Sequence, residues 1–101
     1  MTNETTPRPA TRLRRALAHP DASVRLQAAL TAGSTPDAEY VRELIDRCAV
    51  EPDFYVRDML TWALIRNDRS TVVADLLVEL SSEIPQARAQ ALHTLSKIGD
   101  P

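Results

Sequence analysis

The side chains that could carry out chemistry are few in this sequence and lie far apart. Cys48 is the single cysteine, and the two histidines are His19 and His93. Neither histidine has another histidine or a cysteine at metal-ligand spacing, and no serine or cysteine can be paired with His93 as a nucleophile. Two glycines cannot make a phosphate-binding loop. We therefore predict no catalytic residue, no metal site and no cofactor, and we expect Cys48 to fill the core.

A group of residues with the composition of a binding hot spot lies in segment 55–66. Asp58 and Arg66 lie four residues before and after Trp62, which would place all three on one face of a helix. Tyr55, seven residues before Trp62, falls close to the same line. Tryptophan, tyrosine and arginine are the residues that most often dominate protein interfaces. The alternative interpretation is that Trp62 packs between helices while the two charges bracket it in solvent.

The composition is that of an ordinary helical protein. Of the 101 residues 44% are apolar and 26% are charged, with few aromatic residues or glycines, which favours helices over strands or disorder. The net charge of −2 does not suggest a general nucleic-acid binder. No apolar run approaches the ~20 residues of a membrane span, and the polar start is no signal peptide. We expect a cytoplasmic protein. Arginine supplies nearly all the positive charge, which hints at a bacterial source.

Segments of the sequence repeat one another with a period of 31 to 32 residues. In each, a small apolar residue precedes an arginine, as in Val24-Arg25, Val56-Arg57 and Ala87-Arg88. Apolar residues follow after four and eight positions, which puts one apolar stripe on a helix. The intervening segments repeat as well: Ala10, Leu13 and Leu17 match Val41, Leu44 and Cys48, and these match Val73, Leu76 and Leu80, with Ile45 and Leu77 widening the face.

Each repeat is therefore expected to contain a first helix, a short turn and a second helix. The predicted helices are 10–18, 21–33, 37–49, 53–66, 70–81 and 85–98. Asp21 and Asp53 suit the N-cap positions of second helices, because a carboxylate accepts hydrogen bonds from the free amides of a first turn. Gly33, Asn67 and Gly99 are expected to end the second helices in the left-handed conformation.

The motif Asp-x-x-Val-Arg at residues 21–25 and 53–57, with Ile98-Gly99-Asp100-Pro101 closing a repeat, resembles the short HEAT-like repeats of the phycobilisome-lyase type. Tetratricopeptide and ankyrin arrays have similar periods, but their signature motifs are absent here. The resemblance implies an all-α fold, a right-handed α-solenoid of three antiparallel helix pairs. It covers residues 10–101, with repeats at about 10–34, 35–67 and 68–101, after a flexible tail over 1–9.

In such families the aspartate and arginine of the motif form a structural ladder along the turns that ties each repeat to the next. The resemblance assigns this role to Asp21, Arg25, Asp53, Arg57 and Arg88. The third repeat has Ile84 in place of the aspartate, so Arg88 has lost its own partner in the motif.

The second helices of HEAT-like arrays line a concave surface, which is the usual binding surface. On this resemblance Leu30, Trp62 and His93 are expected side by side across it. We predict a non-catalytic scaffold or adaptor that binds another protein or a peptide. The candidate binding residues are Tyr55, Asp58, Trp62, Arg66, His93 and Lys97.

Alternative functions remain open. HEAT-like repeats also build alkylpurine DNA glycosylases, and four arginines lie close together at positions 8, 12, 14 and 15, but the chain is acidic overall. A lyase-associated subunit rests on fold analogy alone. Leu92, Leu95 and Ile98 are expected to leave an apolar face partly open, which a longer array, a second copy or a partner would cover.

Overall fold

The computed structural model describes residues 8–99, and this part of the chain contains α-helices and no strand. The helices are α1 (Pro9–Leu17), α2 (Ala22–Ser34), α3 (Tyr40–Cys48), α4 (Phe54–Arg66), α5 (Arg69–Glu79) and α6 (Pro85–Gly99). The all-helical fold class is thus confirmed. Every predicted helix is present, and the largest difference is the start of α3 at Tyr40 instead of residue 37. Of the predicted tail, residues 1–7 lie outside the described residues, while Pro9 already begins α1.

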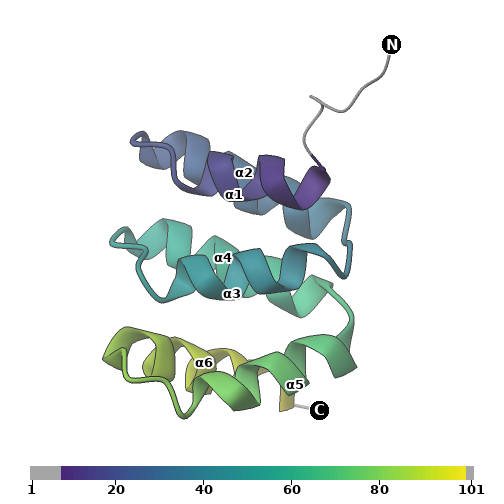
Figure 1. The fold of residues 1–101 in the computed structure, drawn as a ribbon, viewed down its shortest axis with the longest axis vertical. Helices are drawn as coiled ribbons and strands as arrows, with labels where there is room; N and C mark the ends of the chain where they lie inside the picture. Colours follow the sequence, from purple (N-terminus) through teal and green to yellow (C-terminus); the bar gives the residue numbers. More distant parts are fainter. Residues whose placement is uncertain (1–7, 100–101) are drawn as a thin grey trace.

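The helices are stacked in layers of two, as Figure 1 shows. α1 packs beside α2, α3 beside α4, and α5 beside α6. Between the first and second layers, α1 contacts α3 and α2 contacts α4, and the contact between α2 and α4 is the most extensive in the molecule. Segments about thirty residues apart in sequence therefore lie side by side, as the period of the sequence requires.

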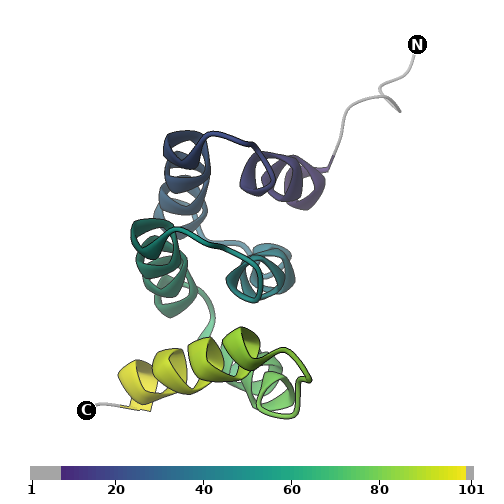
Figure 2. The same cartoon turned by 90° about the vertical axis from the view of Figure 1, so that its left-hand side faces the viewer.

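The third layer is rotated relative to the first two. In Figure 2, α2 and α4 lie one above the other and are strongly foreshortened, whereas α6 extends across the view. α6 accordingly contacts both α3 and α4, whereas α2 packs mainly on α4. The side-chain amide of Gln86 helps to hold this arrangement, because its Nε2 donates to the carbonyls of Cys48 and Glu51, each at 2.8 Å.

The core follows the predicted apolar stripes of α1, α3 and α4. Its largest fully buried apolar residues are Leu17, Val41, Leu44, Val56, Leu60, Leu64 and Val72. Predictions for three residues of the third layer were wrong, because rotation changes the face of α5 that is covered; one of them, Leu80, is exposed. Val72 is buried in place of the half-buried Val73, and Leu77 is exposed although its counterpart Ile45 is buried. The predicted stripe of α2 was wrong as well: Val24 is exposed and Ala28 is half-buried, whereas Ala29 and Ala32 are buried.

The helix starts have the predicted carboxylate caps. Asp21 Oδ1 accepts from the amide of Ser23 at 2.9 Å, and Asp53 Oδ1 accepts from the amide of Val56 at 3.0 Å. Asp68 caps α5 in the same way through the amide of Thr71. The backbone hydrogen bonds hold the pKa values of Asp21 and Asp68 below their ordinary range. These charges also face the positive ends of their helix dipoles.

The predicted left-handed helix ends were wrong. Within residues 8–99 no residue has a positive φ. Gly33 lies inside α2, and Gly99 is the last residue of α6. Asn67 ends α4 through its side chain instead of its backbone, because Nδ2 donates to the carbonyl of Ala63 at 2.8 Å and Oδ1 accepts from the amide of Asp37 at 3.1 Å. The same side chain therefore ties the end of α4 to the loop before α3.

No helix within the described range is long and apolar enough to span a bilayer.

Candidate binding surface

The turns that join the two helices of each layer share one hydrogen-bond pattern. In each turn, the side chain of one residue accepts a hydrogen bond from the backbone amide two residues later. The backbone carbonyl of that same residue accepts a hydrogen bond from the side chain of the arginine six residues later. The side-chain contacts are His19 Nδ1 to Asp21 N at 3.0 Å, Glu51 Oε2 to Asp53 N at 2.9 Å, and Ser82 Oγ to Ile84 N at 3.1 Å. The arginines are Arg25, Arg57 and Arg88, at 2.8, 3.0 and 2.7 Å. The third turn keeps this pattern although Ile84 replaces the aspartate.

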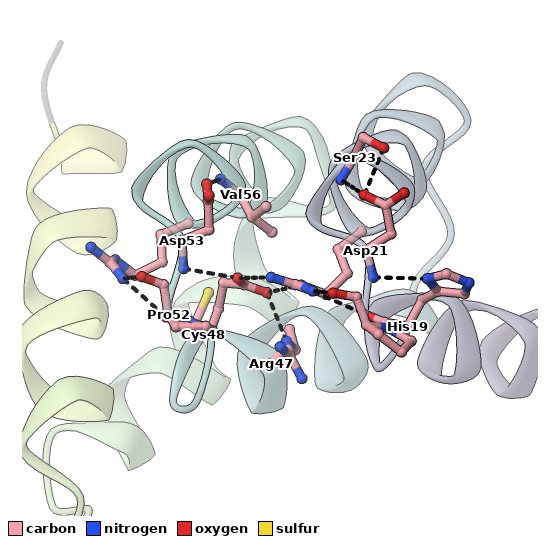
Figure 3. Close-up of polar contacts among 12 residues, drawn as sticks. His19, Asp21, Ser23, Arg47, Cys48, Pro52, Asp53 and Val56 are labelled. Atoms are coloured by element: carbon pink, nitrogen blue, oxygen red, sulfur yellow. Dashed lines mark hydrogen bonds and ion pairs between the residues drawn. The ribbon is translucent and has the colours of Figure 1, made fainter.

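A buried ion pair joins the first turn to the second (Figure 3). Arg25 donates from Nε and Nη2 to the two carboxylate oxygens of Glu51, at 2.9 and 3.0 Å. The Glu51 side chain is 0% exposed, and Arg47 Nε donates to the same carboxylate at 2.9 Å. Arg25 Nη1 donates to the carbonyls of His19 and Pro20. Each buried side-chain nitrogen and oxygen of this ion pair thus has a hydrogen-bond partner.

In the predicted ladder, Asp21 and Asp53 cap helices within their own repeat. The ladder arginines, Arg25, Arg57 and Arg88, donate to backbone carbonyls of their own turns. Among the ladder residues, it is Arg25 that makes a contact from one layer to the next, and its partner is Glu51, a residue that the sequence motif did not include. Its signal in the sequence was its position: Glu51-Pro52-Asp53 repeats His19-Pro20-Asp21 after thirty-two residues.

The ionisation of Glu51 contributes to stability. Burial alone would raise the pKa of its carboxyl, but hydrogen bonds from Arg25, the Asp53 amide and Arg47 outweigh burial and hold the pKa below its ordinary 4.5. The stabilisation is therefore present above about pH 4.5 and is lost as the pH falls through the lower pKa of the folded state.

We expect the free energy of unfolding, measured by urea titration, to fall more steeply below about pH 4.5 in the wild type than in an Arg25→Met/Glu51→Leu variant. The caps at Asp21 and Asp68 titrate in both proteins, and Arg25 is the smallest of the causes that lower the pKa of Asp21, so the difference between the two curves comes mainly from Glu51. Parallel curves would show that this carboxylate has the same pKa in the folded and unfolded states.

An apolar hollow lies between α2 and α4, on the surface predicted to bind a partner. Its volume is about 430 Å³, and it is called the interhelical hollow below. It is lined by Leu26, Leu30, Tyr55, Asp58, Met59 and Trp62. Tyr55 is 72% exposed and Trp62 is 38% exposed. Large apolar side chains are therefore accessible here around a single carboxylate, which is the composition of a hot spot within a groove.

Trp62 both lines the interhelical hollow and packs against the neighbouring layer. A Cβ added to Gly33 would lie 2.7 Å from Cε3 of Trp62 and 2.9 Å from Cα of Ala63, so only glycine fits between α2 and α4 at this point. The guanidinium of Arg66 lies 5.7 Å from the centre of the indole ring and its Nε donates to the carbonyl of Gly33 at 3.2 Å. One part of the Trp62 ring thus faces the interhelical hollow, and another part packs between α2 and α4. Each of the two interpretations made from the sequence, a binding residue and a packing residue, therefore holds for part of the ring.

The other predicted binding residues lie elsewhere. His93 lines a second hollow of about 200 Å³, between α4 and α6. The second hollow is lined by Phe54, Arg57, Asp58, Thr61, Gln90 and His93. Lys97 lies with Ile65 and Arg69 in a third depression. Leu30 and Trp62 line the interhelical hollow together, but His93 is displaced from them because the third layer is rotated. Asp58 is the residue that the first two hollows share.

Two of the clustered N-terminal arginines take part in ion pairs with the second layer. Arg8 lies 3.2 Å from Glu39 and Arg14 lies 3.8 Å from Glu43. Both pairs are at the surface, where such contacts contribute little to stability. They nevertheless neutralise part of the positive charge that the sequence places on the first helix.

Cys48 is buried, as predicted, and burial raises the pKa of its thiol to about 12. A thiol that stays protonated is a poor nucleophile. Among residues 8–99 no three histidine, cysteine, aspartate or glutamate side chains gather closely enough to hold a metal ion.

The face expected to be open at the third layer carries exposed apolar side chains. Leu92 is 63% exposed, whereas Leu95 and Ile98 pack partly against the core. Leu80 is exposed although its counterpart Cys48 is buried by the next layer. Within the described residues this face of α5 and α6 thus has no covering layer.

A comparison with models of known protein families gives no match for this chain, and a search of curated proteins gives none either. No relative therefore assigns a role to these residues, and only their own chemistry and geometry bear on the function.

Proposed function

We propose that this chain is a HEAT-like, right-handed α-solenoid of three antiparallel helix pairs that binds a helical segment of another protein in the interhelical hollow. The repeat architecture is supported by the shared pattern of the three turns and by the packing of α1 on α3 and α2 on α4. In such an array each layer buries its apolar faces against its neighbours, and the second helices offer a continuous surface to a partner.

The observation that carries the proposed function is the exposed apolar lining of the interhelical hollow. Leu30, Tyr55 and Trp62 are all exposed there, while the opposite faces of α2 and α4 are buried in the core. An apolar groove between two helices suits the apolar face of a third helix. Burying these side chains would remove their surface from water at a gain of about 25 cal/mol per Å².

The test is a selection of amphipathic helical peptides against the full chain, followed by titration of tryptophan fluorescence. Trp62 is the only tryptophan, so its emission reports directly on the interhelical hollow. We expect bound peptides to shift the emission to shorter wavelengths. Leu30→Glu should weaken binding by about tenfold or more, because it places an unpaired carboxylate in the contact. Leu30 is a cleaner probe than Trp62, which also packs against Gly33.

Leu92→Glu is the matched control, since Leu92 is an exposed leucine of α6 that lines neither hollow. Binding should be unchanged in this variant. If Leu30→Glu retains full affinity while circular dichroism shows an intact helical fold, the interhelical hollow is not the binding site. The same outcome follows if both variants lose affinity equally.

A further inference from the structure

Among the residues that the structure describes, Asp58 is the one charged side chain that lines the interhelical hollow. It is exposed, and among residues 8–99 it takes part in no hydrogen bond or ion pair. Its position on α4 also places it at the edge of the second hollow. A partner that fills the interhelical hollow must therefore cover at least part of this carboxylate.

The arginines of α4 do not neutralise Asp58, because other contacts hold them. Arg57 Nη1 donates to the carbonyls of Glu51 and Pro52, at 3.0 and 2.9 Å. Arg66 lies over the ring of Trp62 and donates to the carbonyl of Gly33. The carboxylate of Asp58 therefore lies beside an apolar surface, and within the described part no side chain forms an ion pair with it.

Covering an ionised carboxylate with apolar atoms is costly unless a cation or several hydrogen-bond donors replace the lost water. A guanidinium meets this need best, since it can donate two parallel hydrogen bonds to one carboxylate. It also stacks well on aromatic rings, and Tyr55 and Trp62 lie in the same lining. The penalty for an unpaired Asp58 thus selects against partners that bring a neutral or acidic residue to this place.

We propose that the segment bound in the interhelical hollow is an amphipathic helix whose apolar face carries one arginine that pairs with Asp58; this rests on the proposed function. Tyr55 and Trp62 are seven positions apart on α4, or about 10 Å along the helix, which matches two turns of a bound helix. Apolar residues of the partner, three or four positions apart, would contact Leu26, Leu30 and Met59, with the arginine on the same face.

The experiment uses the full chain and a display library of helical peptides of about 16 residues. Their apolar face is fixed except for one position that is varied among arginine, glutamine, glutamate and leucine. Recovered peptides should carry arginine at that position. Synthetic arginine, glutamine and glutamate versions of one recovered peptide are then titrated by Trp62 fluorescence and calorimetry. We expect the arginine peptide to bind about tenfold or more tightly than the glutamine peptide at low salt.

In Asp58→Asn the arginine and glutamine peptides should bind within about twofold of each other, and Asp58→Arg should prefer the glutamate peptide. Glu83→Gln removes the same charge from the exposed turn before α6 and should leave the wild-type preference intact. Equal binding of the arginine and glutamine peptides to the wild type overturns the assignment of Asp58 while leaving the proposed function standing. If no peptide of any charge binds, the proposed function fails and this assignment fails with it.

Discussion

Glu51→Ala is expected to lower the free energy of unfolding by about 3–5 kcal/mol, because removing one partner of a buried ion pair leaves the other charge buried without compensation. The variant leaves the guanidinium of Arg25 buried with only the carbonyls of His19 and Pro20 as partners. The amide of Asp53 loses its acceptor as well. Urea unfolding at neutral pH, followed by Trp62 fluorescence, measures the change.

Glu79→Ala is the matched control. Its carboxylate also pairs with an arginine at 2.9 Å, but Arg42 is 43% exposed, so water can replace the lost partner. We expect a loss of about 1 kcal/mol or less. An Arg25→Met/Glu51→Leu double variant should recover most of the stability, because removing both charges removes the desolvation penalty. A loss of equal size in Glu51→Ala and Glu79→Ala would contradict the importance given to the buried pair.

Gly33→Ala is expected to destabilise the fold by about 1–3 kcal/mol, although alanine is the better helix former by about 1 kcal/mol. The added methyl group would meet the indole ring of Trp62 and, at 2.9 Å, Cα of Ala63. Because the second contact is with backbone, the two helices must move apart to relieve it. The measurement is again the midpoint and slope of urea unfolding.

Gly99→Ala tests whether this effect comes from packing. Gly99 also lies in a helix, and a Cβ built there meets no atom within 4 Å. Its replacement should be neutral or slightly stabilising. A Gly33→Ala variant as stable as Gly99→Ala would mean that α2 and α4 accommodate the methyl group easily. The emission of Trp62 in the folded Gly33→Ala variant should also change, because its ring must shift.

Helix positions were predictable from the sequence because they depend on local signals. The apolar spacing of Leu13 and Leu17 or of Leu60 and Leu64 fixes a buried face, and Asp21 and Asp53 mark helix starts by satisfying free amides. The rotation of the third layer was not predictable in this way. It depends on which side chains of α5 and α6 fit against α3 and α4, and the burial of Val72 instead of Val73 is its result.

The candidate site was predictable in part for the same reason. Tyr55, Asp58 and Trp62 were found because they share one face of one helix, and Leu30 because the repeat places it opposite. His93 and Lys97 were expected there only on the assumption that every layer stacks identically. Glu51 was missed because a glutamate in a turn resembles a solvated charge, and only the packed structure brings Arg25 to it.

The glycine contact between α2 and α4 also bears on the thermodynamics of complex formation. With their backbones in close contact at Gly33, the two walls of the interhelical hollow have little freedom to lose when a ligand arrives. The entropic cost of ordering a backbone therefore falls mainly on the incoming segment. Affinity should consequently rise with the helicity that a free peptide already has in water, so that stapled or alanine-enriched versions bind more tightly without forming any additional contact.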